Sequence, residues 1–258
     1  MLHTGEVFLP NGAIKFKEAF KTFHSYHDYV VKRAGIAQRE QWFIEKVRGK
    51  SCLDIGCLGH KWTIIAESSE SIFNMLKSEA KEITGVDYLK EDVAKLQEMG
   101  YTNVVYGDAV DLNLNRKFDV IILGDLIEHL YDFKGLFKSV KAHLHDQGEV
   151  IITTPNPFYI NQFIMIAVYN KILVNKEHKC WFDPATIFQM LTSNGFAITE
   201  FFWLKDTWGE KIDWKFTSDV RRDAKLLLSW ILRPLRILKK YRTYFCSDFA
   251  VAAKSIMS

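Results

Sequence analysis

The chain has 258 residues, 48% of them hydrophobic and 25% charged, and its formal net charge is +3. This composition indicates an ordinary soluble globular protein, long enough for one large domain or for one domain with a substantial cap. The four cysteines are scattered and form no CxxC pair, which speaks against a disulfide framework and against a thiolate zinc site. We therefore expect a reducing compartment, the cytoplasm.

The sequence shows no signal for secretion or for insertion into a membrane. Residues Met1 to Asn11 lack a cationic stretch followed by an apolar run, and no uncharged apolar stretch reaches the roughly 18 residues of a spanning helix. Charge is uneven, because Val220 to Arg242 carries eight Lys or Arg against one Asp, a net +7, which leaves −4 on the rest. A basic block on a mildly acidic body suggests an anionic partner.

The N-terminal part of the chain has a helical pattern. From Ile14 to Val47, apolar and aromatic residues recur mostly at helical spacings, with no proline and few glycines. We expect one or two helices here, forming a helical extension over residues 1–48 before the main domain of residues 49–258.

From Ser51 onward, short β-branched runs that end in Gly or Asp alternate with helical stretches. This rhythm is typical of βαβ units and a parallel sheet. The expected strands are Ser51 to Ile55, Glu82 to Val86, Asn103 to Tyr106, Phe118 to Leu123 and Glu149 to Thr154. Ligands of open α/β sheets bind beyond the carboxyl ends of the strands, so the residues that follow these strands should converge on one crevice.

The second half of the chain adds insertions and two further strands. An apolar stretch from Phe158 to Val174 precedes Asp183-Pro184, which predicts a helix start with Asp as cap and Pro at the first position. Ala197 to Trp203 and Asp248 to Ala253 are the expected last strands. We expect helical insertions at about residues 157–180 and 206–244.

The turn after the first strand carries two glycines, Gly56 and Gly59, directly after Asp54. A residue without a Cβ lets the backbone come close to a ligand, although a tight strand-to-helix turn of any α/β protein would show the same feature. Asp87 ends the second strand, where a carboxylate can accept hydrogen bonds from two ribose hydroxyls. Asp108 follows the third strand and could accept from a purine amino group. Each acid alone could be a helix cap, but three in register favour a ligand.

These segments together resemble the class I methyltransferases, which use S-adenosylmethionine. The resemblance rests on Leu53-Asp54-Ile55-Gly56-Cys57, Gly85-Val86-Asp87, Gly107-Asp108-Ala109, Phe118-Asp119-Val120-Ile121 and Glu128-His129-Leu130, in that order and spacing. It covers about Lys50 to Phe202, and Ser247 to Ala253 is similar to the antiparallel seventh strand of that family. The resemblance implies a Rossmann-like α/β fold with seven strands, mostly parallel, and helices on both faces.

The resemblance also implies roles for individual residues in binding the cofactor. Those assigned to the methionine moiety are Asp54, Gly56, Gly59, Leu123, Gly124 and Asp125. Asp87 is assigned to the ribose, and Asp108 and Ala109 to the adenine; the neighbours His60 and Tyr88 complete the candidate set.

The turn departs from the usual Gly-x-Gly-x-Gly of the family. Leu58 and His60 stand where the second and third glycines are expected. The Gly59-His60 ending and the later Glu177-His178-Lys179-Cys180-Trp181-Phe182 resemble a branch associated with glycan biosynthesis. That branch implies a sugar or another small polar hydroxyl compound as methyl acceptor.

A hydroxyl acceptor needs a base near the transferred methyl group, because the acceptor must lose its proton. His129 follows the fourth strand on the crevice side and is the leading candidate, with His178 as the second. The alternative for each histidine is a purely structural role.

Asp125, Glu128 and His129 are spaced i, i+3 and i+4, which on a helix would place two carboxylates and an imidazole on one face. Such a face can hold a divalent ion. It is similar to the Glu-x-x-Glu-His metal site of ubiquinone-pathway O-methyltransferases and small-RNA 2′-O-methyltransferases, with Asp125 in place of the first Glu. A metal could orient a diol, but the simpler alternative, with Asp125 as a helix cap and His129 acting alone, is preferred.

The basic block Val220 to Arg242 also contains leucines, isoleucines and Trp230 near helical spacing, with Pro234 as a kink or break. It predicts a basic amphipathic element for peripheral contact with an anionic membrane or acceptor, or else a cap helix packed on the body. The segment Phe158 to Val174 is too short to span a membrane. Nucleic acid is a weaker interpretation, since no recognised binding-fold signature accompanies the charge.

The sequence therefore predicts a S-adenosylmethionine-dependent methyltransferase that O-methylates a sugar or other small polar hydroxyl compound. Two alternatives remain outside that reaction. A nicotinamide-dependent dehydrogenase also has a glycine turn and a strand-two acid, but its Gly-x-Gly-x-x-Gly is absent. A non-catalytic S-adenosylmethionine-binding regulator or scaffold is the other.

Overall fold

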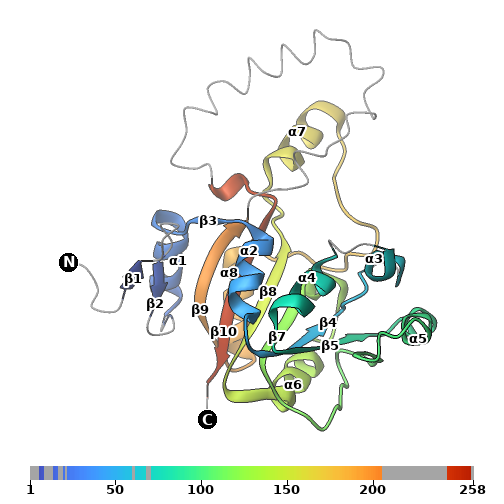
Figure 1. Cartoon of the computed structure of the whole chain (residues 1–258). Coiled ribbons are helices and arrows are strands. Elements are labelled where there is room, and N and C mark those ends of the chain that lie inside the picture. The colour runs from blue at the N-terminus through green and yellow to red at the C-terminus, as the bar shows by residue number, and fades with distance from the viewer. Residues whose placement is uncertain are drawn as a thin grey trace.

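The computed structural model describes residues 6–8, 14–16, 20, 22–59, 62–67, 71–204 and 243–256. Its centre is an eight-stranded sheet with the order β3-β9-β10-β8-β7-β4-β5-β6 (Figure 1). The strands of this sheet are β3 (Ile36–Ala37), β4 (Ser51–Ile55), β5 (Glu82–Asp87), β6 (Val104–Tyr106), β7 (Phe118–Gly124), β8 (Leu144–Pro155), β9 (Phe196–Leu204) and β10 (Asp248–Ser255).

Strands β4 to β8 run parallel to one another, and β10 runs antiparallel to both of its neighbours, β8 and β9. The predicted mostly parallel, Rossmann-like sheet with an antiparallel last strand is confirmed. The eighth strand is the short edge strand β3, which pairs in parallel with β9 and which the sequence pattern did not reveal.

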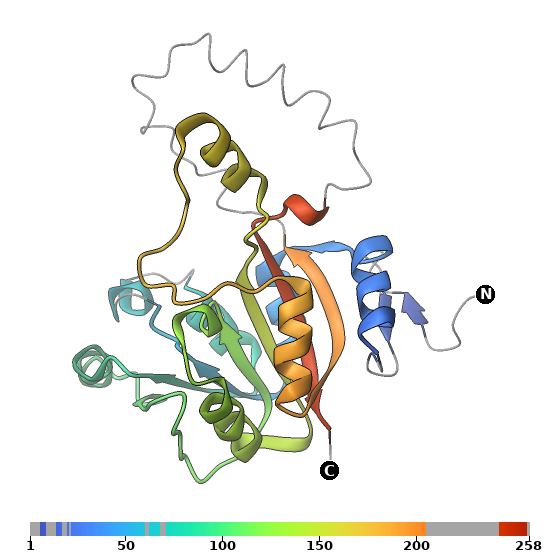
Figure 2. The same ribbon diagram turned by 180° about the vertical axis from the view of Figure 1, so that it is seen from behind.

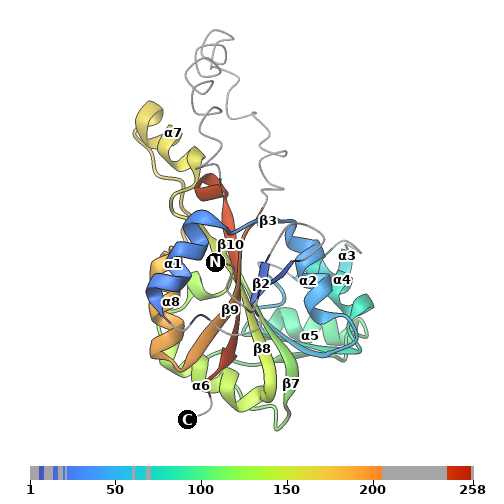
Figure 3. The same ribbon diagram turned by 90° about the vertical axis from the view of Figure 1, so that its left-hand side faces the viewer.

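Helices cover both faces of the sheet (Figure 3). One face carries α1 (Phe23–Lys32), α6 (Phe133–His143) and α8 (Pro184–Ser193), and the other carries α2 (Arg39–Val47), α4 (Ile72–Glu79) and α5 (Lys90–Glu98). Because successive strand residues point to opposite faces, Ile121 of β7 joins the first core and Ile122 joins the second. Each such fully buried side chain stabilises the fold by about 1.5–3 kcal/mol.

The N-terminal part contains the two predicted helices, α1 and α2, but also strands. Residues Ile14–Phe16 form β2, which pairs antiparallel with β1 (Glu6–Phe8), so the helical expectation for this stretch was wrong. The alternation of Ile14, Lys15 and Phe16 has the period of a strand, and it is too short to register against the helical pattern that follows. Helix α1 packs on the body through Tyr26, whose ring stacks on Phe188 of α8 at 5.0 Å between centroids.

Helix α8 begins where the sequence predicts. Asp183 is its N-cap, accepting hydrogen bonds from the backbone N–H groups of Ala185 and Thr186, and Pro184 is its first residue. The preceding insertion contains α7 (Ile160–Tyr169), which projects away from the layered body (Figures 1 and 2).

The second insertion begins after Leu204, and residues 205–242, which include the basic block Val220 to Arg242, lie outside the described part of the chain. The chain is described again from the short helix η4 (Thr243–Phe245). There the side-chain amide of Asn156 donates to the carbonyls of Tyr244 and Cys246, at 2.9 Å each. Across the sheet, Asp248 at the start of β10 pairs with Leu204 at the end of β9. No helix among the described residues has the length and apolarity to cross a bilayer.

Candidate active site

The glycine turn, Gly56 to Gly59, lies at the carboxyl end of β4 and is fixed by the end of β5. The N–H of Gly56 donates to the carbonyl of Val86 at 2.8 Å, and the N–H of Leu58 donates to the Asp87 carboxylate at 3.1 Å. Gly56 and Gly59 have φ angles of +83° and +61°, which glycine adopts without steric cost. A Cβ on Gly56 would also lie 3.0 Å from Leu126 Cδ1. Both glycines are therefore required by the backbone of the turn.

The structure explains one of the two departures from the usual glycine pattern. Leu58 is not among the described residues with a positive φ, so its position does not need glycine. Its side chain is 1% exposed and belongs to the core on the α2 face. His60, the other departure and a predicted cofactor residue, lies outside the described residues.

Two buried acids, Asp54 and Asp87, lie at the ends of neighbouring strands. The carboxylate of Asp87 accepts from the N–H groups of Leu58 and Leu89, both at 3.1 Å, and also from that of Tyr88. Burial raises the pKa of Asp87 above its usual value, although these N–H groups oppose the rise. Burial, and then the charge of Asp87, raises the pKa of Asp54 to about 7, while Arg39 lowers it.

The other predicted cofactor residues differ in their accessibility. Tyr88 and Asp108 are exposed, and Asp108 also accepts from the N–H of Val110 at 3.0 Å. Ala109 and Leu123 are buried, and their side chains belong to the core on the α1 face. Gly124 lies next to Arg39, whose Nη2 would be 3.8 Å from a Cβ at that position.

Asp125 is held by two partners from distant parts of the chain. Arg39 of α2 forms an ion pair with Asp125 at 2.7 Å, and its Nη2 donates to the Thr153 hydroxyl at 3.1 Å. That hydroxyl donates in turn to the other Asp125 oxygen at 2.9 Å. The φ of Asp125 is +49°, a conformation that non-glycine residues rarely adopt. The network holds Asp125 in that conformation and occupies both of its carboxylate oxygens.

The predicted helix with Asp125, Glu128 and His129 on one face is not formed. The segment contains only a 3₁₀ turn, Ile127–His129, which ends at Leu130. The positive φ of Asp125 turns the chain immediately before it, so the i, i+3, i+4 spacing does not place the three side chains together.

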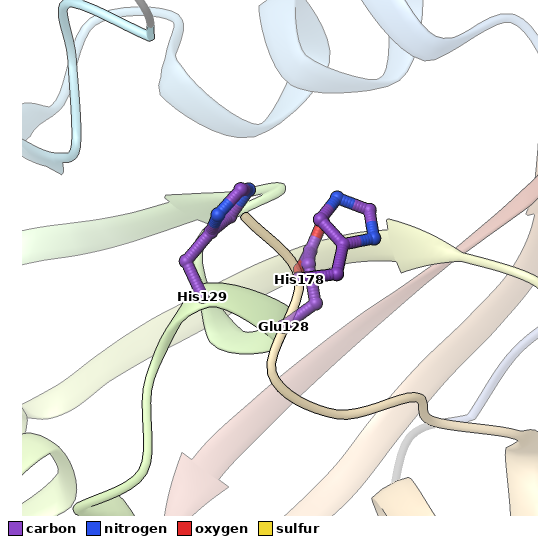
Figure 4. Close-up of side chains that lie close together, drawn as sticks. All are labelled: Glu128, His129 and His178. Carbon is purple, nitrogen blue, oxygen red and sulfur yellow. The ribbon is translucent and has the colours of Figure 1, made fainter. Parts of the chain in front are cut away.

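A different group of side chains comes together instead, the histidine cluster of Glu128, His129 and His178 (Figure 4). One ligand atom of each residue lies within 4.8 Å of the others. The two imidazole rings are perpendicular, with their centroids 4.7 Å apart. His178 arrives from the segment after α7, which is fixed to the 3₁₀ turn because the N–H of Lys179 donates to the Glu128 carbonyl at 2.8 Å. Both predicted catalytic histidines thus lie in one place.

Glu128 gives the histidine cluster a buried carboxyl group. It is 1% exposed, and its Oε2 accepts from the Thr154 hydroxyl at 3.0 Å. Its Oε1 is buried without a hydrogen-bond partner in the described part of the chain. Burial, and then the nearby charge of Asp125, raises the pKa of Glu128 to about 8. This carboxyl therefore holds a proton near neutral pH and has one oxygen unmatched.

Two residues of the site, Arg39 and Thr154, were not selected from the sequence. Arg39 begins a helix in the N-terminal extension, far from the strand ends in sequence, and Thr154 lies at the end of an ordinary strand. The available signal was positional: Thr153 and Thr154 end the fifth predicted strand, at the carboxyl edge where ligands bind.

The arrangement fits a cofactor that has an adenosyl group and a carboxylate. Asp87 presents oriented carboxylate lone pairs at the end of β5, which suit vicinal ribose hydroxyls. Arg39 presents a guanidinium beside Asp54 and Gly124, and its Nε is buried without a hydrogen-bond partner in the described residues. A donor of this kind would be satisfied by a carboxylate such as that of a methionine moiety.

Comparisons with known proteins agree with this fold. A family model described as a methyltransferase domain matches residues 29–200. The chain is 27% identical over 177 residues to the ubiquinone biosynthesis O-methyltransferase of Rickettsia canadensis, covering 63% of this chain and 72% of that protein. It is 25% identical over 199 residues to the protein of the same name from Rickettsia felis, covering 70% and 77%.

Solved structures show the same architecture. A SAM dependent methyltransferase from Archaeoglobus fulgidus superposes with a TM-score of 0.56 at 21% identity, covering 84% of this chain and 91% of that one. The PH0226 protein from Pyrococcus horikoshii superposes with a TM-score of 0.52 at 13% identity, covering 91% and 92%. The family match sets aside the dehydrogenase and the non-catalytic alternatives. The chain belongs to the methyltransferase-domain family, and its predicted class, a S-adenosylmethionine-dependent methyltransferase, is confirmed.

Proposed function

We propose that this methyltransferase acts on a hydroxyl oxygen of a sugar or another small polar compound, with the histidine cluster accepting the hydroxyl proton. The observation that carries the proposal is the pair of imidazoles 4.7 Å apart, half-buried at the carboxyl edge of the sheet. The name of the rickettsial relatives, O-methyltransferase, supports an oxygen acceptor. The sequences Gly59-His60 and Glu177 to Phe182 resemble a branch associated with glycan biosynthesis, which supports a sugar as acceptor.

When bound, S-adenosylmethionine supplies a methyl group on a positively charged sulfur. We assign its binding to the predicted residues according to the part of the cofactor that each would hold. Asp54, the glycine turn and Leu123 to Asp125 would hold the methionine part, Asp87 and Tyr88 the ribose, and Asp108 and Ala109 the adenine. Arg39 joins this set as the partner of the methionine carboxylate.

Bound S-adenosylmethionine would supply this methyl group to the acceptor oxygen by in-line displacement, with its sulfur as the leaving group. Residues of this chain must orient the oxygen and take its proton. His129 is the leading acceptor of that proton and His178 the second, and the proton then passes to water. A positioned base of this kind contributes about 10²- to 10⁴-fold to the rate.

The proposal is tested by measuring S-adenosylhomocysteine release with methyl glycosides, nucleotide sugars and catechols as acceptors. We expect His129→Asn to lower kcat by about 10²-fold or more and His178→Asn by less, with unchanged S-adenosylhomocysteine affinity by calorimetry. His145→Asn, which changes an exposed histidine of β8, is the matched control. Wild-type turnover in both cluster variants, or transfer to amines alone, would refute the proposal.

A second candidate is metal-assisted O-methylation of a diol or lipid-associated acceptor. The histidine cluster favours it, because Glu128, His129 and His178 can each offer a ligand atom within 4.8 Å of the others. This set differs from the predicted one, because Asp125 is bonded to Arg39 and Thr153 instead. His178 takes the place of Asp125 in the set. A divalent ion there would orient two vicinal oxygens and lower the pKa of one hydroxyl. Activity lost in EDTA and restored by Mg²⁺, Mn²⁺ or Zn²⁺ supports this candidate, and undiminished turnover after exhaustive chelation removes it.

A further inference from the structure

Among the side chains of α7 that the structure describes, a polar one is buried and large apolar ones are exposed. Gln162 is 7% exposed, whereas Phe163 and Ile166 are 47% and 46% exposed. A helix of a globular protein normally turns its apolar stripe inward. Here the buried amide serves as an internal anchor, since its Oε1 accepts from the N–H of Leu173 at 2.9 Å.

The apolar surface continues beyond the helix on both sides. We call it the apolar ridge, and its exposed side chains are Phe158, Phe163, Ile166, Tyr169, Ile172, Leu173 and Val174. Single exposed apolar residues are ordinary, but seven within one short stretch of chain form a patch of the kind that marks an interaction site.

The charges around the apolar ridge are mainly positive. No charged residue occurs from Thr154 to Asn170, whereas the exposed Lys171, Lys176 and Lys179 follow, opposed by the exposed Glu177. An uncharged apolar segment bordered by lysines is typical of elements that lie in the interface of a membrane with anionic lipids.

The position of the apolar ridge suits a flat, extended partner. Helix α7 stands clear of the layered body in all three views (Figures 1, 2 and 3). Its 10 residues are too few to cross a bilayer, which needs about 20. The ring of Phe245 in η4 contacts that of Phe163 at 6.3 Å between centroids, and the sequence just before η4 is the basic block of net charge +7. Helix η4, which directly follows the basic block in the sequence, thus contacts the ridge.

We infer that the apolar ridge is a docking surface for the interface of an anionic lipid bilayer, with α7 lying on the membrane and the lysines contacting the headgroups. The segment that forms the ridge leads directly to His178, so the docking surface and the histidine cluster share one stretch of chain. Docking would hold the acceptor side of the enzyme against the membrane surface. This inference is independent of the acceptor and of the base proposed above.

The experiment is co-sedimentation of the full chain with vesicles of phosphatidylcholine, with and without phosphatidylglycerol. We expect binding to the anionic vesicles that weakens with salt. The double variant Ile166→Ser/Ile172→Ser should lower the partition coefficient by about tenfold or more, since each buried CH₂ contributes about 0.8 kcal/mol. Its matched control, Met99→Ser/Ile256→Ser, changes two equally exposed apolar residues elsewhere and should bind as the wild type does.

A charge-reversal pair separates the lysines near the ridge from general basicity. Lys171→Glu/Lys176→Glu should reduce binding to anionic vesicles, whereas Lys134→Glu/Lys138→Glu, on exposed positions of α6, should leave it near the wild-type value. Unchanged S-adenosylhomocysteine affinity shows that each variant is folded.

Three outcomes would overturn the inference. One is a wild-type chain that fails to sediment with anionic vesicles at low salt. Another is equal binding by the ridge variant and its control. The third is a lipid-free dimer that Ile166→Ser/Ile172→Ser converts to monomer without any change in vesicle binding, which would assign the ridge to a second copy of the chain.

Discussion

The glycine turn and the histidine cluster lie at the same edge of the sheet, but different means hold them in place. In the glycine turn, backbone N–H groups bond to the end of the neighbouring strand, at Val86 and Asp87. In the histidine cluster, Glu128 is held by the side chain of Thr154, and His178 arrives from a remote segment. The first region is specified by local sequence, and the second depends on contacts between distant residues.

The largest expected effect concerns the buried acid beside the glycine turn. The pKa of Asp54 is about 7 in the folded chain against an ordinary value of 3.8, so its ionisation costs stability as the pH rises between these values. At about 1.4 kcal/mol per pKa unit the cost reaches about 4 kcal/mol above pH 7. The free energy of unfolding of Asp54→Asn, measured in urea relative to the wild type, should therefore rise from pH 4 to pH 7.

The control for Asp54 is Asp119. Hydrogen bonds from Ser51 lower the pKa of Asp119 below its ordinary value. The stability that Asp119 contributes is complete above its ordinary pKa and is lost only at lower pH. Asp119→Asn should therefore show no trend between pH 4 and 7. If Asp54→Asn were equally flat, Asp54 would not be the titrating group.

The ion pair that connects the two regions should give the next largest effect. Arg39→Met leaves Asp125 without its cation, and because the pair is partly exposed we expect a loss of about 2–3 kcal/mol, below the roughly 3–5 kcal/mol of a fully buried pair. Arg48→Met breaks an exposed pair with Glu79 and should cost about 0–1 kcal/mol. Thermal unfolding of both variants compares them, and equal shifts in Tm would mean that the network does not hold Asp125.

The glycine turn itself can be broken with one methyl group. Gly56→Ala imposes the strain of a positive φ, about 1–2 kcal/mol, and places the Cβ against Leu126. Gly100→Ala has φ +94° and open space around the Cβ, so it carries only the strain. Calorimetry should show weaker S-adenosylhomocysteine binding for Gly56→Ala alone. Comparable affinities would show that the turn does not contact the cofactor.

The smallest effect is expected within the histidine cluster. Thr154→Val removes the donor to Glu128 and should cost about 1 kcal/mol of stability. If Glu128 positions the histidines, kcat falls severalfold as well. Thr199→Val, in β9, removes a hydrogen bond to the Ala252 carbonyl of β10 and should leave kcat unchanged. A fall in kcat in both variants would indicate general loosening of the sheet.

Much of the fold could be predicted because, as in the glycine turn, neighbouring residues in the sequence determine where strands and helices begin and end. The expected runs Ser51 to Ile55 and Phe118 to Leu123 are rich in β-branched or apolar residues and are each followed by Gly, and they became β4 and β7 within a residue of the expected ends. Asp183 and Pro184 marked the start of α8 for the same local reason. Strands β1, β2 and β3 were missed because their two or three residues carry too little pattern, whereas the equally short β6 was marked by the Gly107-Asp108 that follows it.

The histidine cluster could be predicted only in part. His129 and His178 were selected separately, but nothing in the sequence shows that they meet, because the meeting depends on the Lys179 backbone reaching Glu128. The spacing of Asp125 and Glu128 suggested a helix face, and the positive φ of Asp125 removed it. That φ is supported by Arg39, which nothing in the helical pattern of its segment distinguishes from an ordinary surface cation. The assignment of the predicted residues to the cofactor stays a prediction until binding is measured.

The pairing of Leu204 with Asp248 has a consequence for how this enzyme can vary. The end of β9 and the start of β10 are neighbours in the sheet, and Asn156 fixes the chain just before β10 by two hydrogen bonds. Among the described strands, β9 and β10 are thus consecutive antiparallel neighbours, and the length of chain that connects such a pair affects stability only weakly. Exchange of the connecting residues between relatives should therefore leave the catalytic frame intact.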